Sequence, residues 1–240
     1  MAEYSAVIAG ATGATGREFV CFLLTRERCT RVTVLVRDAK KCAAKLEKTA
    51  AGTAIDQDAL KKKLQMVEFD YEALCSEGSD GAQAKKLAGH SVGINCLGTT
   101  KKDAGGLKGW MRVDRDYYNA FTRGLRAQGV PSLIQISWAG ASPTSFFAQP
   151  RTKGECDKVS AEAGFSSLVV LRPGLLDRGD QARPIEKFGM FVSLADLTLL
   201  QSVAFGLQPR AAPPLAVALR DEGGEGFRCG RAGVRAKHAR

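Results

Sequence analysis

The chain has 240 residues, of which 45% are hydrophobic, and its formal net charge is +10. This length suits one α/β domain with a small appended segment, and the apolar fraction is sufficient for a sizeable core. The basic residues form short pairs such as Lys85-Lys86 with no aromatic-and-basic motif, which argues against a nucleic-acid partner and favours solvated helix ends.

The first predicted element is a buried strand at residues 6–9, followed by glycines at Gly10, Gly13 and Gly16 and by an apolar helical face at residues 19–24. A strand, a glycine turn and a helix in this order are the context of a dinucleotide site. Gly10 permits the sharp turn, Gly13 lets backbone N–H groups approach a pyrophosphate, and Gly16 lets the helix pack closely on the sheet. The positive end of this helix would face the phosphates.

A second strand is predicted at residues 32–36, and Arg37 follows it directly. In an NAD site, an acidic residue near this place binds the ribose 2′-hydroxyl. A guanidinium here, with Arg17 at the start of the preceding helix, suits a 2′-phosphate instead. The sequence therefore favours NADP(H) as the cofactor, although Asp38 is the next residue.

Helical and strand patterns alternate along the rest of the first 174 residues. Further strands are expected at residues 64–69, 92–97, 132–136 and 167–171, and helices at 40–48, 56–63, 112–128 and 155–164. This alternation predicts a doubly wound, parallel α/β sheet of the Rossmann type, with helices on both faces. Ligands bind such sheets at the carboxyl ends of the strands. The residues expected at those ends are Gly10, Arg37, Asp70, Leu97, Gly98, Ser137 and Pro173.

The C-terminal part of the chain has a different composition. Residues 188–207 are largely apolar, but Asp196 would lie near the centre of a membrane span, so we predict a buried helix and no span. From residue 208 the chain is rich in Pro, Gly and Arg, and we expect a loose basic tail there. The predicted organisation is a Rossmann domain at 1–184, a substrate-side segment at 185–207 and an irregular tail at 208–240.

The cysteines and histidines bear on location and on metal sites. Seven cysteines occur without a C-x-x-C spacing and without a secretory signal, which is typical of reduced thiols and leads us to expect a cytoplasmic or nuclear protein. With only two histidines, His90 and His238, we predict neither a metal site nor a histidine-based relay.

Five stretches together resemble the atypical short-chain dehydrogenase/reductases, and most closely the Tat-interacting-protein family of oxidoreductases. They are Gly10-Ala-Thr-Gly-Ala-Thr-Gly-Arg17, Cys96-Leu-Gly-Thr-Thr100, Arg112-Val-Asp-Arg-Asp-Tyr117, Lys153-Gly-Glu155 and Arg172-Pro-Gly-Leu-Leu176. The block from Leu97 to Tyr117 is the most specific. The second strand with Arg37 and Asp38 also resembles the flavin reductase branch of the same superfamily.

This resemblance implies a set of cofactor contacts. The residues matching the pyrophosphate turn are Thr12, Gly13, Ala14 and Thr15, and Arg37 matches the arginine on the 2′-phosphate. Leu97 and Gly98 match residues under the nicotinamide ribose, and Lys153 matches the lysine that holds the ribose hydroxyls. Leu176 and Arg183 match further cofactor contacts.

One catalytic group of the resembled family is missing. Its tyrosine proton donor stands four residues before the lysine, where this chain has Gln149, and glutamine cannot titrate. Ser137 and Lys153 remain as candidate catalytic residues. We predict an NADP(H)-dependent oxidoreductase that reduces an unknown small carbonyl, quinone or flavin. The alternative is a non-catalytic NADPH-sensing protein that acts through regulatory protein partners.

Overall fold

The computed structural model describes residues 2–43 and 62–173. Its strands are β1 (Tyr4–Ala9), β2 (Cys29–Val36), β3 (Leu64–Glu68), β4 (Val92–Asn95), β5 (Ser132–Ile136) and β6 (Ser167–Leu171). Its helices are α1 (Ala14–Leu24), α4 (Tyr71–Glu77), the 3₁₀ turn η1 (Gly78–Asp80), α5 (Ala82–Lys85), α6 (Leu107–Met111), the π-helix η2 (Arg112–Tyr117), α7 (Tyr118–Ala127) and α8 (Ala148–Glu162). The expected domain limits at 184 and 207 lie outside the described residues.

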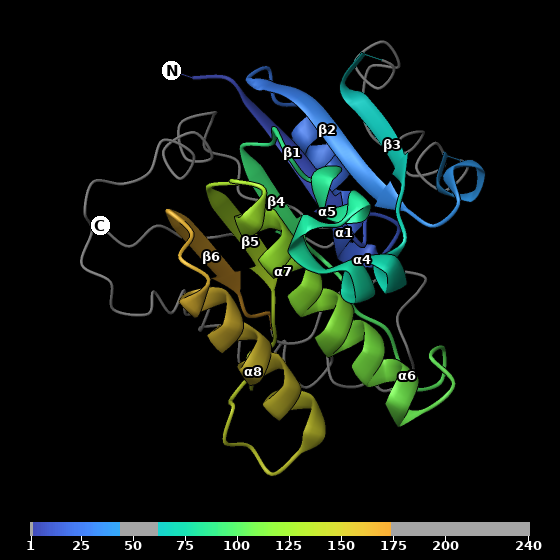
Figure 1. Ribbon diagram of the computed structural model, residues 1–240, viewed down its shortest axis with the longest axis vertical. Coiled ribbons are helices and arrows are strands. Elements are labelled where there is room, and N and C mark those ends of the chain that lie inside the picture. Colours follow the sequence, from blue (N-terminus) through green and yellow to red (C-terminus); the bar gives the residue numbers. More distant parts are fainter. Residues whose placement is uncertain (1, 44–61, 174–240) are drawn as a thin grey trace, which may run out of the picture.

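The six strands form one parallel sheet in the order β3-β2-β1-β4-β5-β6 (Figure 1). The chain begins in the middle, builds outwards to β3, then returns to the other side of β1 with β4. This reversal between β1 and β4 is the switch point at which doubly wound sheets bind ligands. The predicted fold class is confirmed.

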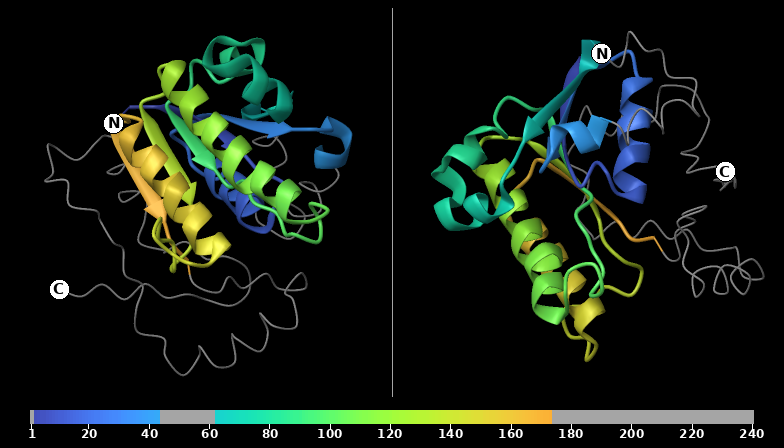
Figure 2. Two further views of the ribbon diagram at one scale, coloured as in Figure 1. Left: turned by 60° about the horizontal axis from the view of Figure 1, so that its bottom comes forward. Right: turned by 90° about the vertical axis from the view of Figure 1, so that its right-hand side faces the viewer.

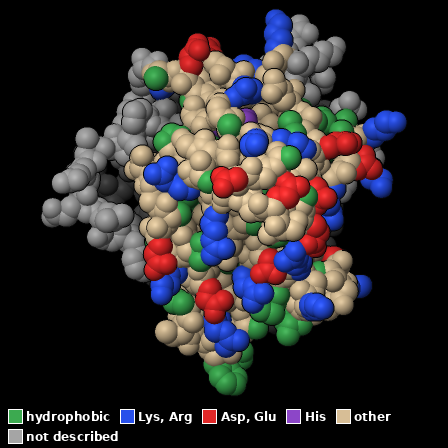
Figure 3. Space-filling view, in the orientation of Figure 1, with side chains coloured by type: hydrophobic (Ala, Val, Ile, Leu, Met, Phe, Trp, Pro, Cys, Tyr) green, Lys and Arg blue, Asp and Glu red, His purple; other side chains and the backbone are tan. Residues whose placement is uncertain are grey.

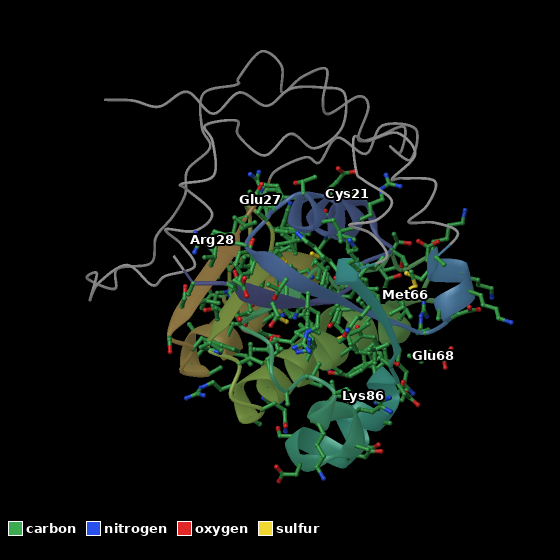
Figure 4. The ribbon with its side chains drawn as sticks, turned by 90° about the horizontal axis from the view of Figure 1, so that it is seen from above. Cys21, Glu27, Arg28, Met66, Glu68 and Lys86 are labelled. Carbon is green, nitrogen blue, oxygen red and sulfur yellow. The ribbon has the colours of Figure 1, made fainter. Side chains whose placement is uncertain are left out.

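Helices cover the sheet on both faces, with α1 on one side and α4, α5, α7 and α8 on the other (Figure 2). The view in Figure 4 shows the same layering through two labelled side chains: Cys21 of α1 lies on one side of the sheet and Lys86, after α5, on the opposite side. Because strand side chains alternate between faces, β1 contributes to both layers. Ala6 and Ile8 pack towards α1, whereas Val7 and Ala9 pack towards α7.

Several elements differ from their predicted bounds. The expected helix at 112–128 is part of a longer helical run that begins at Leu107 and contains the π-helix η2. The helix expected at 155–164 begins earlier, at Ala148, and includes Pro150 in its first turn. Proline is compatible with that place because the first N–H groups of a helix have no partner within the helix.

The surface in Figure 3 shows basic and acidic side chains interspersed, with no continuous basic face in that view. No helix within the described parts of the chain is both long and apolar enough to cross a membrane. The apolar stretch at 188–207 lies outside those parts.

Candidate functional site

The carboxyl ends of β1 and β4 meet at the switch point of the sheet. Gly10, directly after β1, has φ of +79°, and a Cβ atom there would lie 2.4 Å from the carbonyl oxygen of Cys96. Only glycine tolerates both the left-handed backbone and this approach. The glycine turn therefore contacts the segment after β4 at the carboxyl edge of the sheet.

The glycine turn leads directly into α1. The amide of Gly13 donates to the carbonyl of Gly10 at 3.1 Å, and this bond closes the turn. A Cβ at Gly16 would lie 2.1 Å from the same carbonyl oxygen, so the absence of a side chain lets the helix start against the turn. The separate roles predicted for Gly10 and Gly16 agree with these contacts.

The amino-terminal end of α1 has the features of an anion site. Gly13 is its N-cap residue, no side chain caps it, and no acidic residue lies in its first turn. Thr12 and Gly13 are exposed, whereas Ala14 and Thr15 are half-buried. The first N–H groups of a helix lack intrahelical partners and carry the positive end of the helix dipole, so these four residues fit a pyrophosphate.

Arg37 follows β2 at the same edge of the sheet and is exposed. Within residues 2–43 and 62–173, its guanidinium has no hydrogen-bond or ion-pair partner. Asp38 is engaged locally: its Oδ1 accepts from the amide of Lys41 at 3.0 Å, and its Oδ2 lies 3.4 Å from Lys41 Nζ. The Lys41 amide is the main cause of the lowered pKa of Asp38.

Asp70, at the end of β3, has a structural role in α4. Its Oδ1 accepts from the amides of Glu72 and Ala73 at 2.8 and 3.1 Å, which makes Asp70 the N-cap of the helix. A capping aspartate of this kind stabilises a helix by about 1 kcal/mol. The carboxylate is exposed at the carboxyl edge of the sheet, so the predicted cofactor contact of Asp70 stays a prediction.

Lys153 lies in α8 and is buried. Its Nζ lies 3.0 Å from Oδ1 of Asp114 and 4.6 Å from the ring centre of Tyr118. The other oxygen of Asp114 accepts from the Thr99 amide at 2.8 Å, which brings the segment with Leu97 and Gly98 towards Lys153. A Cβ atom at Gly98 would lie 3.6 Å from Oδ1 of Asp114, so Gly98 and Lys153 lie beside the same buried carboxylate.

Ser137, directly after β5, is buried and its hydroxyl donates to Oδ2 of Asp157 at 2.8 Å. The same carboxylate accepts from Gln135 Nε2 at 2.8 Å and from Arg172 Nη2 at 2.8 Å. Burial raises the pKa of Asp157, and the hydrogen bond from Ser137 partly offsets this. Ser137 is therefore part of a closed polar network, and its predicted action on a substrate carbonyl stays a prediction.

Gln149 is exposed in the first turn of α8, one helical turn before Lys153. The preceding loop carries three exposed aromatic side chains, Trp138, Phe146 and Phe147. This loop packs on α8, since a Cβ at Gly154 would lie 2.3 Å from the backbone of Pro143 and Ser142. The side chain at position 149, where the resemblance implies a tyrosine, therefore faces solvent beside an aromatic loop.

Sequence reasoning did not assign a role to Asp114 or Asp157. Asp114 is in helical register with Tyr118, Phe121 and Leu125, which are buried, and a carboxylate on such a face is a sign of a buried ion pair. Asp157 stands one turn after Lys153 in α8. Leu176 and Arg183, the two remaining predicted contacts, lie outside the described residues.

A separate cavity of about 430 Å³ lies between α4, η1, η2 and α7. Its charged lining includes Arg112, Asp116 and Arg123. Arg112 is already paired there with Glu72 and with Asp116. Among the described residues, no group of histidine, cysteine and carboxylate side chains could hold a metal ion.

Comparisons with known proteins agree with this geometry. A family model described as NAD(P)H-binding matches residues 10–187. Protein HTATIP2 of Rattus norvegicus is 33% identical over 78% of this chain and 69% of its own length. The mitochondrial protein fmp52 of Aspergillus fumigatus is 28% identical over 77% of this chain and 72% of its own length.

Solved structures show the same fold at low sequence identity. The reductase domain of PhqB from Penicillium fellutanum superposes with a TM-score of 0.56 at 18% identity, covering 73% of this chain and 49% of that domain's chain. A putative NAD-dependent epimerase/dehydratase from Bacillus halodurans gives a TM-score of 0.52 at 13% identity, covering 72% of each chain. This chain thus spans about half the length of the PhqB reductase-domain chain.

The expectation of a cytoplasmic or nuclear protein is contradicted by the names of these relatives, because the fmp52 proteins of several Aspergillus species are mitochondrial. Free cysteines indicate a reducing environment but do not identify the organelle. The resemblance seen in the sequence is confirmed, since the family model matches most of the chain and Protein HTATIP2 is a relative. The chain belongs to the NAD(P)H-binding family, among the proteins that resemble the atypical short-chain dehydrogenase/reductases.

Proposed function

We propose that the protein binds NADP(H) in preference to NAD(H) and uses it to reduce a small carbonyl, quinone or flavin. The observation that carries this proposal is Arg37, an exposed guanidinium at the tip of β2 without a carboxylate partner among the described residues. A 2′-phosphate offers such a guanidinium two charge-assisted hydrogen bonds, which a ribose hydroxyl does not. The hydrogen bond that Asp38 accepts from the Lys41 amide and its ion pair with Lys41 support this assignment, because they engage the acidic neighbour of Arg37 locally.

The rest of the proposed cofactor site lies along the carboxyl edge of the sheet. The glycine turn and the start of α1 would bind the pyrophosphate through Thr12, Gly13, Ala14 and Thr15. Leu97, Gly98 and Lys153 would hold the nicotinamide ribose at the far end. Leu176 and Arg183 are proposed as further contacts on the resemblance alone. The bound dinucleotide would supply the hydride, which is the difficult part of the chemistry.

Reduction of a carbonyl also requires a proton, which the nicotinamide cofactor does not supply. Gln149 has no acidic proton to give, but it is exposed, so water reaches the place of the missing tyrosine. The loop before this place carries the exposed aromatic side chains of Trp138, Phe146 and Phe147. Flat conjugated acceptors such as quinones and flavins stack on aromatic rings and take their proton from water. We therefore propose quinones and flavins as substrates in preference to simple carbonyls.

The cofactor assignment is tested by titrating the purified protein with NADPH and with NADH while following nicotinamide fluorescence. We expect Arg37→Ala to weaken NADPH binding by about 10- to 100-fold and to leave NADH binding nearly unchanged. Arg126→Ala, which removes an exposed arginine from α7, is the matched control and should change neither affinity. Equal affinity of the wild type for both nucleotides would overturn the role of Arg37.

A second function is favoured by the partners of the polar side chains. Ser137 is bonded to Asp157, Lys153 is paired with Asp114, and Gln149 cannot titrate. A protein that only senses NADPH and acts through protein partners needs no free catalytic group. Incubation with NADPH and a panel of carbonyls, quinones and flavins separates the two functions: oxidation of NADPH supports the reductase, and binding without turnover supports the sensor.

A location in mitochondria is proposed on the names of the fmp52 relatives. Cell fractionation with antibodies against the native protein tests it, and recovery in the cytosolic fraction alone would refute it.

A further inference from the structure

Asp114 is a buried carboxylate with two partners from separate parts of the fold. Its Oδ1 pairs with Lys153 Nζ at 3.0 Å, and its Oδ2 accepts from the Thr99 amide at 2.8 Å. The side chains of Asp114 and Lys153 are only 5% and 11% exposed. A buried ion pair with good geometry is costly to break, because either charge left alone in the interior is strongly unfavourable.

The π-helix η2 sets the direction of Asp114. It interrupts the helical run between α6 and α7, and a π-turn carries more residues than an α-turn, which changes the faces that successive side chains occupy. Asp114 contacts α8 twice, through Lys153 and through its carbonyl oxygen, which accepts from the Cys156 thiol at 3.4 Å. Local π-turns are frequent at functional sites.

A second buried carboxylate, that of Asp157, lies one turn after Lys153 in α8, but it already has hydrogen-bond partners. Asp157 accepts hydrogen bonds from Ser137, Gln135 and Arg172. With Gln149 in place of a tyrosine, no phenol stands one turn before Lys153. Among the described residues, Asp114 is therefore the carboxylate that neutralises Lys153.

We propose that Asp114 is a positioning residue for the nicotinamide end of the site. By holding the Lys153 ammonium and the Thr99 amide together, it fixes the distance between α8 and the Leu97-Gly98-Thr99 segment, on which the nicotinamide ribose would rest. This inference rests on the proposed NADP(H) binding. It predicts that Asp114 matters for the whole dinucleotide but not for its adenosine half, which binds at Arg37.

The test compares two ligands, NADPH and adenosine 2′,5′-bisphosphate, by titration of the full chain. Asp114→Asn keeps an acceptor for the Thr99 amide but removes the charge that holds Lys153. We expect it to weaken NADPH binding about 10-fold, the loss of one charged contact, and to leave the bisphosphate within about twofold of the wild type. Arg37→Ala should weaken both ligands.

Asp116→Asn is the matched control. Asp116 lies in the same π-helix and its carboxylate is bonded to Arg112 and Arg115, not to Lys153. Its substitution should change neither affinity. Thermal unfolding of each variant confirms that it is folded before titration.

A double variant covers the case in which Asp114→Asn alone does not fold. Asp114→Asn with Lys153→Met removes both charges together, so no unpaired charge remains buried. If Asp114 acts through Lys153, the double variant loses no more NADPH affinity than Lys153→Met alone. Losses that add would show that Asp114 does not act through Lys153 and would overturn the proposal.

The outcomes separate this inference from the proposed function. If the wild type binds neither ligand, NADP(H) binding itself fails. If it binds both and Asp114→Asn binds NADPH as tightly as the wild type, the positioning role is refuted. An equal loss for both ligands refutes it as well, since a general distortion would then explain the effect.

Discussion

The two ends of the proposed cofactor site are built in different ways. At the adenosine end, the turn from Gly10 to Gly13 and the start of α1 present backbone groups, and Arg37 extends into solvent. At the nicotinamide end, Ser137 and Lys153 are buried and each is bonded to a carboxylate from another segment. Apart from Arg37, the first end is formed by the local shape of the backbone, whereas the second depends on side chains that the fold brings together.

This difference bears on the proposed function, in which cofactor binding and catalysis depend on different ends of the site. A backbone turn tolerates substitution elsewhere, as long as its glycines remain. At the other end, position 149 holds a glutamine, which does not titrate, and Lys153 is paired with Asp114. The backbone turn after β1 therefore does not depend on the side chain at position 149.

The largest effect on stability is expected from a substitution in the glycine turn, which forms the first of the two ends. Gly10→Ala places a Cβ 2.4 Å from the Cys96 carbonyl oxygen in a left-handed residue. We expect a loss of about 3 kcal/mol or more in the free energy of unfolding, measured by urea denaturation. Gly129→Ala is the control, because Gly129 has φ of +76° but nothing within 4 Å of its Cβ. That variant should lose only about 1–2 kcal/mol, the cost of the backbone conformation.

Equal losses in the two glycine variants would show that the close approach of β1 and β4 is not what requires Gly10. The comparison therefore isolates the contact from the backbone angle.

A somewhat smaller effect is expected at the side-chain-built end. Asp157→Ala leaves the donors of Gln135, Ser137 and Arg172 without this acceptor. We expect the free energy of unfolding to fall by about 2–3 kcal/mol, while Asp157→Asn, which keeps one acceptor oxygen, should lose less. Urea denaturation of both variants measures the difference. Identical stability of Asp157→Ala and the wild type would contradict a stabilising role for the network.

The smallest effect concerns an exposed cluster beside the adenosine end. Arg112, and after it Tyr117, hold the pKa of Glu72 down at about 2, below its ordinary value of 4.5. A depressed carboxyl pKa gives stability that is present above the ordinary value and is lost as pH falls towards about 2. The stability difference between wild type and Glu72→Gln should therefore disappear over this acidic range. Solvent screening keeps the difference small.

NMR titration of the Glu72 carboxyl group measures this directly. A midpoint near 4.5 would show that the contacts to Arg112 and Tyr117 do not hold in solution. Glu162→Gln, which removes a carboxylate 3.8 Å from Lys158 on the exposed face of α8, controls for the loss of one surface charge.

Much of this molecule could be predicted from its sequence, because the relevant signals are local. Strand and helix periodicity depends on neighbouring residues, so β1, α1 and β5 were placed closely and the parallel sheet followed from their alternation. The need for glycine at Gly10 and Gly16 was predicted from the tight turn, which admits no side chain there, while their contact with a cofactor stays a prediction. The position of Arg37 at the tip of β2 follows from the end of an apolar run.

The tertiary structure alone decided which side chains meet. Asp114 lies in η2 and Lys153 in α8, and their contact depends on how two helices pack on the sheet and on a π-turn that periodicity does not reveal. Ser137 and Asp157 likewise meet only across β5 and α8. Local sequence patterns determine backbone shape, whereas the pairing of buried charges is determined by packing between distant segments, since a buried charge must find its partner wherever the fold brings one.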